Sequence, residues 1–163
     1  MSAAQPPRGA APVGYLYELP FLEAAAVQYF RLWCAGPAHQ EEVWNDFAST
    51  IGPHEGRQAL SSLEELCALI AERRRRPLMR HPVHCKLLGA DEAVLANLIG
   101  AAADGTEHEA LLFAALMVDG QRTLSAVRIA ERFAKSLTLM KTQCDGPQVG
   151  PLHHEKPLSN RLH

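Results

Sequence analysis

Apolar side chains recur at helical spacing along most of the chain, between residues 20 and 141. Apolar residues three and four positions apart share one face of a helix, so this spacing predicts amphipathic helices. Gly36-Pro37, Gly52-Pro53 and Pro77 interrupt the pattern, as glycine and proline do at helix ends. We therefore predict an all-α fold, a single compact bundle of five to six helices.

Six segments carry the helical pattern. They span about residues 20–35, 37–51, 53–76, 89–104, 106–118 and 121–141. The fifth segment is apolar nearly all round, which predicts a position deep in the bundle. On the sixth, the spacing places Leu124 inward. Thr106 and Glu109 fit a capping box at the start of the fifth helix.

The ends of the chain lack this period. Residues 1–18 are rich in alanine, proline and glycine, which predicts a flexible N-terminal arm. Residues 19–141 form the predicted helical domain. Residues 142–163 are broken by glycine and proline, which predicts a disordered C-terminal tail.

Composition excludes several classes of function. A net charge of −2 over 163 residues argues against a protein that coats nucleic acid. No apolar run reaches the roughly 20 residues of a membrane helix, because polar side chains interrupt the best candidate. With no export signal visible, we expect a cytoplasmic location. There the four cysteines should be reduced, with Cys67 filling the core and Cys34 disfavoured as a thiolate by its place near a helix C-terminus.

A proline-broken connector is predicted between helices 3 and 4, in the stretch RRRRPLMRHPVHCKLLGADE at residues 73–92. It contains His81, His84 and Cys85 in an H-x-x-H-C cluster, and imidazole with thiolate is a ligand set that zinc favours. A closed zinc site needs four ligands. The missing ones would come from a second subunit or from isolated groups such as Cys34, Asp91 or Glu92.

Two other interpretations of this cluster need no metal. In the one we favour, His81 and His84 are polar surface residues and Cys85 is a small apolar side chain that holds the loop on the core. In the other, Cys85 is a reactive thiol whose thiolate is favoured by Arg80 and Lys86.

The connector also holds the main basic concentration of the chain. Its members are Arg73, Arg74, Arg75, Arg76 and Arg80. Such a cluster suits an acidic protein partner or phosphate. Arginines at a helix C-terminus also interact favourably with the helix dipole, by about 0.3 to 1 kcal/mol per charge.

Motifs for catalysis or nucleotide binding are absent. The sequence lacks the glycine patterns that hold phosphates, and Leu112 replaces the second histidine of an H-E-x-x-H zinc helix at His108-Glu109. A helix-turn-helix pattern around Ala48 and Gly52 fails because acidic side chains occupy its exposed face. An enzyme is therefore not the favoured prediction, and DNA binding ranks low.

Two stretches, LEAAAVQYFRLWCAGPAHQ and RRRRPLMRHPVHCKLLGADE, resemble parts of small all-helical proteins of alphaproteobacteria with no assigned function. The resemblance covers most of residues 20–140. Proteins of this kind often carry a second cysteine near the position of Lys86 or Leu87, whereas this chain has Cys85 alone. The resemblance implies a helical fold and no activity.

Together these observations favour a non-enzymatic binding or regulatory protein that acts on an unknown protein partner. The predicted partner-binding residues are the five arginines of the basic cluster. The first alternative is a metal- or thiol-sensing protein that uses His81, His84 and Cys85, with zinc as its ion; otherwise no cofactor is expected. The second alternative is a weak DNA-binding regulator. The apolar helices are also compatible with a homodimer.

Overall fold

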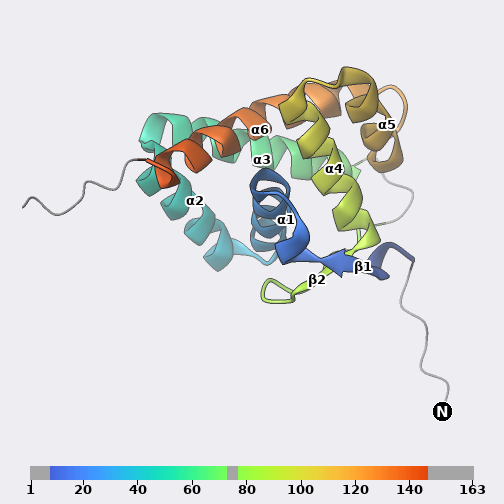
Figure 1. The fold of residues 1–163 in the computed structure, drawn as a ribbon, viewed down its shortest axis with the longest axis horizontal. Coiled ribbons are helices and arrows are strands. Elements are labelled where there is room, and N and C mark those ends of the chain that lie inside the picture. The colour runs from blue at the N-terminus through green and yellow to red at the C-terminus, as the bar shows by residue number, and fades with distance from the viewer. Residues whose placement is uncertain (1–7, 73–76, 147–163) are drawn as a thin grey trace, which may run out of the picture.

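The computed structural model describes residues 8–72 and 77–146, which form six α-helices and one pair of short strands (Figure 1). The helices are α1 (Phe21–Cys34), α2 (Pro37–Ile51), α3 (Pro53–Glu72), α4 (Ala90–Asp104), α5 (Glu107–Met117) and α6 (Thr123–Cys144). The strands are β1 (Pro12–Tyr15) and β2 (Leu87–Gly89), and two 3-10 helices, η1 (Arg8–Ala10) and η2 (Leu16–Glu18), flank β1. The predicted compact all-α fold is confirmed.

Glycine separates the first three helices for a conformational reason. Gly36 precedes α2 with φ of 116°, and Gly52 precedes α3 with φ of 86°. Side chains other than hydrogen rarely tolerate such backbone angles. Each glycine is followed by a proline that starts the next helix, where its missing N–H costs nothing.

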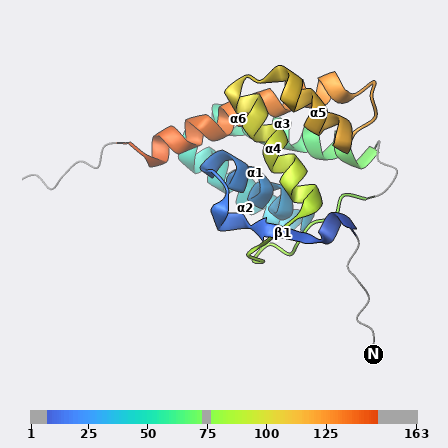
Figure 2. The same ribbon diagram turned by 45° about the vertical axis from the view of Figure 1, so that its right-hand side comes forward.

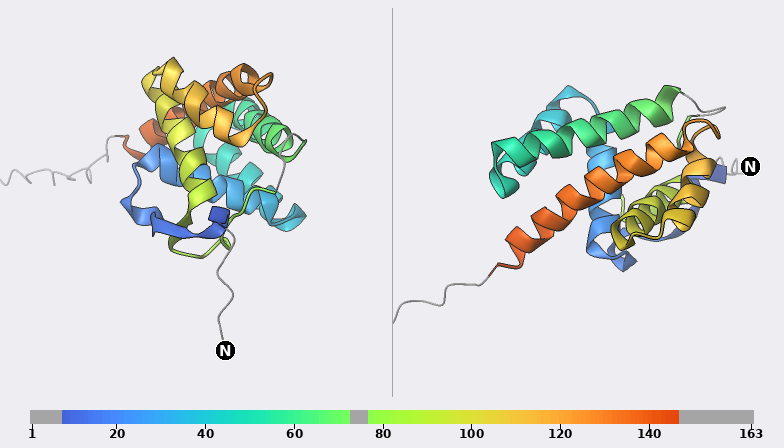
Figure 3. Two further views of the ribbon diagram at one scale, coloured as in Figure 1. Left: turned by 90° about the vertical axis from the view of Figure 1, so that its right-hand side faces the viewer. Right: turned by 90° about the horizontal axis from the view of Figure 1, so that it is seen from above.

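The core lies between α1 and the helices around it. α1 packs against α2, α4 and α6, and α3 runs beside α6, as the view from above shows (Figure 3). Phe47 of α2 and Phe133 of α6 are almost fully buried and meet edge to face, with ring centroids 6.4 Å apart. Gly56 lets the backbone of α3 approach that of α2 closely.

The strand pair lies along one side of the bundle, away from α5 (Figures 1, 2 and 3). β1 pairs antiparallel with β2, with Pro12 opposite Gly89 and Tyr15 opposite Leu87. Residues 8–18, which fall in the predicted N-terminal arm, thus hold regular structure. Helical periodicity gives no sign of it, because the partner strand lies in the connector. At the other end, α6 continues to Cys144, and most of the predicted tail lies outside the described residues.

Three local predictions were wrong: that α5 lies deep in the bundle, that Leu124 faces inward, and that Thr106 and Glu109 form a capping box. Leu112 and Leu116 of α5 are each 66% exposed, and Leu124 of α6 is 51% exposed. For the two leucines of α5 the reason is that this helix packs mainly against α4 and α6, which leaves its other face uncovered. The capping box also fails, since the Thr106 hydroxyl donates to the Ala101 carbonyl. Among the described residues, no helix has both the length and the apolarity to cross a membrane.

Candidate functional site: the clamped connector

From residue 77 to residue 86 the chain has no regular secondary structure before it enters β2. Polar backbone groups of such a segment need partners wherever they are shielded from water. Here many of the partners are side chains of α1 and α4.

Arg31 of α1 is fully buried, and its guanidinium donates most of the side-chain hydrogen bonds that hold this segment. Its Nη1 donates to the Cys85 carbonyl at 2.6 Å and its Nη2 to the Leu87 carbonyl at 2.7 Å. Nε and Nη2 also donate to the two carboxylate oxygens of Glu92, at 2.7 and 2.8 Å. A planar guanidinium can make such a bidentate pair and still have donors for backbone carbonyls.

Glu92 of α4 is likewise fully buried and completes the clamp from the other side. Its carboxylate accepts the backbone N–H of His81 and of Gly89, both at 2.9 Å. Burial by itself would raise the pKa of Glu92, but hydrogen bonds from Arg31, Gly89 and His81, together with the Arg31 charge, lower it below the ordinary value. The carboxylate is therefore ionised in the folded protein at neutral pH.

Further contacts fix both ends of the connector. Asp91 of α4 accepts the Met79 N–H at 2.9 Å, and Gln28 of α1 donates to the Val83 carbonyl at 3.2 Å. The Leu16 N–H donates to the Lys86 carbonyl at 2.9 Å, which ties the connector to the N-terminal segment. The connector is thus anchored on α1, on α4 and beside β1.

The H-x-x-H-C cluster is only partly assembled. His81 Nδ1 lies 3.8 Å from Cys85 Sγ, and both residues are half-buried, whereas His84 is exposed. No group of three or more metal-binding side chains occurs within residues 8–72 and 77–146. Two of the expected additional ligands are engaged elsewhere, Asp91 with Met79 and Glu92 with Arg31.

His81 retains one unusual feature. Its Nε2 is buried without a hydrogen-bond partner among the described residues. The ring packs close to Gly89, where an added Cβ would stand 3.3 Å from His81 Cδ2. This contact and the Nδ1 contact with Cys85 indicate that the ring fills the space between β2 and the Cys85 side chain.

The predicted basic cluster falls mostly outside the described residues, because Arg73, Arg74, Arg75 and Arg76 are not among them. The fifth member, Arg80, is half-buried and donates from Nη2 to the Cys34 carbonyl at 2.8 Å. That carbonyl belongs to the last residue of α1, where helix carbonyls lack partners within the helix. Arg80 therefore closes the C-terminus of α1.

A shallow apolar hollow of about 430 Å³ opens where the connector meets the N-terminal segment. We call its lining the connector surface, which consists of Leu16, Tyr17, Ala24, Gln28, Val83, His84, Cys85 and Lys86. Tyr17 is 73% exposed and stacks on Tyr15, with ring centroids 5.3 Å apart. Val13 of β1 and Phe21, the first residue of α1, are also exposed.

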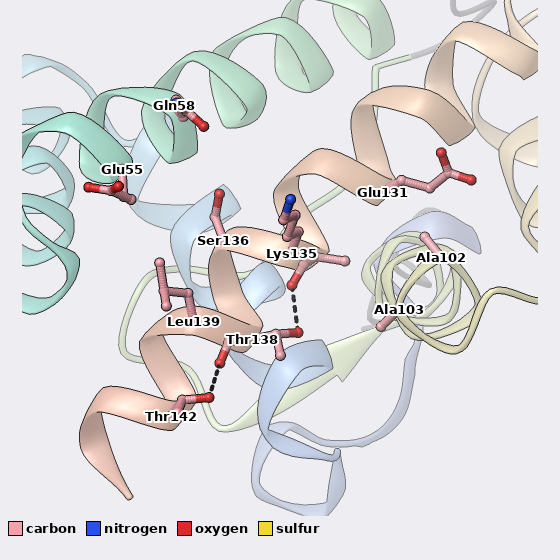
Figure 4. A pocket seen from close by; sticks show the side chains of 11 residues that line it. Glu55, Gln58, Ala102, Ala103, Glu131, Lys135, Ser136, Thr138, Leu139 and Thr142 are labelled. Atoms are coloured by element: carbon pink, nitrogen blue, oxygen red, sulfur yellow. Dashed lines mark hydrogen bonds between the residues drawn. The ribbon is translucent and has the colours of Figure 1, made fainter. Parts of the chain in front are cut away.

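A second hollow, of about 680 Å³, lies between α3, the end of α4 and α6 (Figure 4). Two of its hydroxyls are already engaged within α6, since Thr138 donates to the Ala134 carbonyl and Thr142 to the Thr138 carbonyl. Glu55 and Lys135 also line it. Its polar groups form no nucleophile and base pair of the kind that catalysis needs.

Sequence reasoning found the connector but missed what holds it. In the sequence, Arg31 is one of the polar side chains that interrupt the apolar run of the first helical segment. One feature of the sequence indicates its burial: it is the lone arginine in a largely apolar helical segment, where a buried charge is expected to be paired. Its partner Glu92, 61 residues later, has the position of an ordinary acidic residue in a first helical turn.

No family model, curated protein or solved structure matches this chain. The geometry of the connector and of its surface is therefore the basis on which its function is inferred.

Proposed function

We propose that this is a non-enzymatic binding protein that recognises a segment of a protein partner on the connector surface. The observation that carries the proposal is the support of that surface. Three of its residues, Val83, Cys85 and Lys86, have their carbonyls held by hydrogen bonds from Gln28, Arg31 and the Leu16 N–H. A preformed surface loses little conformational entropy on binding. Loops held by a rigid scaffold are common sites of recognition.

The chemistry of the surface suggests the chemistry of the partner. Its hollow is apolar and open, and Tyr17 at its edge is the kind of rigid, amphipathic side chain that often dominates protein interfaces. Lys86 and His84 are exposed at the same place. The ligand that fits is a segment with an apolar or aromatic side chain for the hollow and a carboxylate beside it for Lys86.

The experiment is a peptide-display selection on the purified protein, followed by affinity measurements with the selected peptides. We expect Tyr17→Ala to weaken binding by roughly thirtyfold, about 2 kcal/mol, as for a tyrosine that dominates an interface. We expect Lys86→Glu to weaken the peptides that contain acidic residues. Leu112→Ala is the matched control, because Leu112 is similarly exposed on the remote helix α5. Equal affinity of the wild type and Tyr17→Ala would contradict the proposal.

The predicted role of Arg73 to Arg76 extends this proposal. These arginines stand at the start of the predicted connector, directly before residue 77, so an acidic segment bound to the connector surface is expected to reach them. Replacing all four with glutamine should lower the association rate and the salt dependence of binding. Arg80 differs from these four arginines because its guanidinium donates a hydrogen bond to the Cys34 carbonyl. Replacing Arg80 is therefore expected to change the local structure as well as the binding.

The metal- and thiol-sensing alternative for the connector rests on His81 and Cys85, which are in contact. Two ligands are fewer than a structural zinc site needs, so we rank it second. Stoichiometric zinc in the purified protein, lost in His81→Ala, would reverse this ranking. The weak DNA-binding alternative predicts salt-sensitive retention on duplex DNA, and elution that is independent of salt would remove it.

A further inference from the structure

The groove between α3 and α6 contains a third hollow, of about 540 Å³, whose lining residues all come from these two helices. We call it the basic hollow. It is adjacent to the hollow of about 680 Å³ shown in Figure 4, because Gln58 and Lys135 line both. The described residues of these two hollows include none of the connector surface. Hollows of this size are typical of sites that bind small molecules.

Positive charge predominates in the basic hollow. Among the described residues, its charged side chains are Arg57 of α3, Arg132 and Lys135 of α6, and one carboxylate, that of Glu65 on α3. Glu65 accepts hydrogen bonds from the Ser61 hydroxyl and from Arg132 Nη2, so its charge is balanced by Arg132. Two cations thus remain in excess in one hollow of a chain whose net charge is −2.

Arg57 and Lys135 are the cations that remain. Neither has an ion pair or a hydrogen bond with any residue in the described ranges, 8–72 and 77–146. A helix commonly pairs a cation with a carboxylate three or four residues away, but no such carboxylate flanks Arg57 on α3. Glu131, four residues before Lys135, lies 3.7 Å from Arg128 instead. Both cations are therefore available to a ligand.

The position of the basic hollow on α3 adds to its positive potential. α3 begins at Pro53, and His54 and Arg57 lie in its first two turns, where the helix dipole favours negative charge nearby. His54 itself adds no charge, because its Nε2 accepts a hydrogen bond from the Gln58 amide at 3.1 Å. Glu55, from the same turn, lines the neighbouring hollow instead. The charge of the groove therefore changes along its length.

We propose that the basic hollow binds the phosphate group of a small hydroxyl-bearing phosphate monoester, whose remaining part occupies the neighbouring hollow. A phosphate monoester carries about −1.5 to −2 charges at neutral pH, which matches the two excess cations. The Arg57 guanidinium can donate to two phosphate oxygens at once, and the Lys135 ammonium can donate to the third. One ligand would then bridge α3 and α6.

The neighbouring hollow determines the orientation of the ligand. Glu55 of α3 and Glu131 of α6 line it (Figure 4), and their carboxylates repel an anion but accept hydrogen bonds from hydroxyl groups. The Thr138 and Thr142 hydroxyls donate to backbone carbonyls, so their oxygens can also accept. The hydroxyl-bearing part of the ligand therefore fits the neighbouring hollow, and the phosphate fits the basic hollow.

The first test is a titration of the isotope-labelled full-length protein with ribose 5-phosphate, followed by amide chemical shifts and by calorimetry. We expect the shifts to concentrate on residues 54–65 of α3 and 131–142 of α6. Ribose 5-phosphate should bind at least tenfold more tightly than inorganic phosphate, and ribose should not bind. Shifts that concentrate on the connector surface, or equal affinities for ribose 5-phosphate and inorganic phosphate, would overturn the proposal.

Variants test the two cations. Arg57→Gln and Lys135→Gln should each weaken binding of ribose 5-phosphate by roughly tenfold, as for a lost hydrogen bond between charged groups. Lys141→Gln is the matched control, because Lys141 is an exposed cation of α6 outside both hollows. Equal weakening by this control would indicate attraction by overall charge and would overturn the proposal.

The ligand-free variants add a readout of stability. Because Arg57 and Lys135 lack partners within the described part of the chain, their replacement should leave the midpoint of thermal unfolding unchanged without ligand. In the wild type, ribose 5-phosphate should raise this midpoint. A lowered midpoint of the ligand-free variants together with unchanged binding would assign a structural role to these cations and would overturn the site.

Glu55→Gln tests the orientation of the ligand. It removes an acceptor for the hydroxyl groups and also a charge that repels the phosphate. The preference for ribose 5-phosphate over inorganic phosphate should therefore fall. An unchanged preference would overturn the placement of the hydroxyl-bearing part in the neighbouring hollow.

Discussion

Arg31 and Glu92 form a fully buried ion pair, and each of them also hydrogen-bonds the backbone of the connector that separates them in the sequence. A buried ion pair often contributes little net stability, because removing two charges from water is costly. Here the same two side chains also satisfy four backbone groups: the Cys85 carbonyl and His81 N–H of the connector, and the Leu87 carbonyl and Gly89 N–H of β2. Their role is therefore to fix the shape of the connector where it enters β2.

Breaking this pair from one side should be severe. Glu92→Gln leaves the Arg31 charge buried without its carboxylate, so we expect a loss of about 3 to 5 kcal/mol in the free energy of unfolding, measured by urea denaturation. Glu109→Gln is the control, because Glu109 is half-exposed and its contact with His108 is 4.0 Å long; it should change stability by less than about 0.5 kcal/mol. Equal effects of the two variants would refute a structural role for the clamp.

Removing both charges should distinguish the effect of the clamp on the stability of the protein from its effect on the order of the connector. In Arg31→Met/Glu92→Leu no charge is stranded, so the double variant should be more stable than Glu92→Gln. The connector nevertheless loses its partners. We expect faster amide hydrogen exchange at His81 and Gly89 than in the wild type. Unchanged protection at these two amides would show that the clamp does not hold the connector.

The clamp also predicts acid sensitivity. The pKa of Glu92 is lower in the folded protein than the ordinary 4.5, so near that pH the unfolded chain binds more protons at this site than the folded one. Its contribution is fully present above about pH 4.5 and is lost as the pH falls through the folded pKa. Glu23 has a raised pKa, from burial and from Asp104, and acts in the opposite sense. Denaturation of wild type and Glu92→Gln from pH 7 to pH 3 should show the steeper loss in the wild type.

Gly56 tests the packing of α2 on α3. A Cβ at this position would lie 3.0 Å from Ala48 N and 3.1 Å from the Phe47 carbonyl carbon. These are backbone atoms of α2 and cannot move aside as a side chain can. We expect Gly56→Ala to destabilise the protein by about 1 to 3 kcal/mol, although alanine favours a helix. Gly120→Ala, with no atom within 4 Å of the added Cβ, should have little effect in the same urea titration.

The exposed face of α5 gives a contrasting prediction. Leu112 and Leu116 lie one helical turn apart and are each 66% exposed. Replacing both with glutamate should change the free energy of unfolding by less than about 0.5 kcal/mol per site. The same variant tests the homodimer that the apolar helices suggest, by sedimentation over a range of concentrations. If self-association uses this face, the variant will sediment as a monomer where the wild type does not.

Sequence periodicity was sufficient to predict the helices, but it did not predict which faces of the helices pack against one another. Glycine and proline mark the boundaries at Gly36 and Gly52 because the backbone angles there restrict the residue type. Apolarity alone did not reveal which faces of α5 are covered. That depends on where α4 and α6 lie, and a nearly uniform apolar pattern carries no information about direction.

The candidate site was also predictable from the sequence only in part. The connector was recognisable from its prolines and its reactive side chains. Its clamp was not, because Arg31 and Glu92 each have an ordinary local explanation and only their contact distinguishes them. Arg80 was likewise predictable only as a member of a basic cluster. Its hydrogen bond to the Cys34 carbonyl at the end of α1 joins segments far apart in the sequence, which a spacing rule cannot express.

The clamp also bears on the order in which the chain acquires its structure. Arg31 and Glu92 lie 61 residues apart in the sequence, so their pairing requires α1 and α4 to dock first. Contacts of this separation form slowly, because a long loop must close before they contribute. We therefore expect the connector, and with it the pairing of β1 with β2, to consolidate after the helices. A folding study that follows the His81 amide separately from the helical amides would record it as the later event.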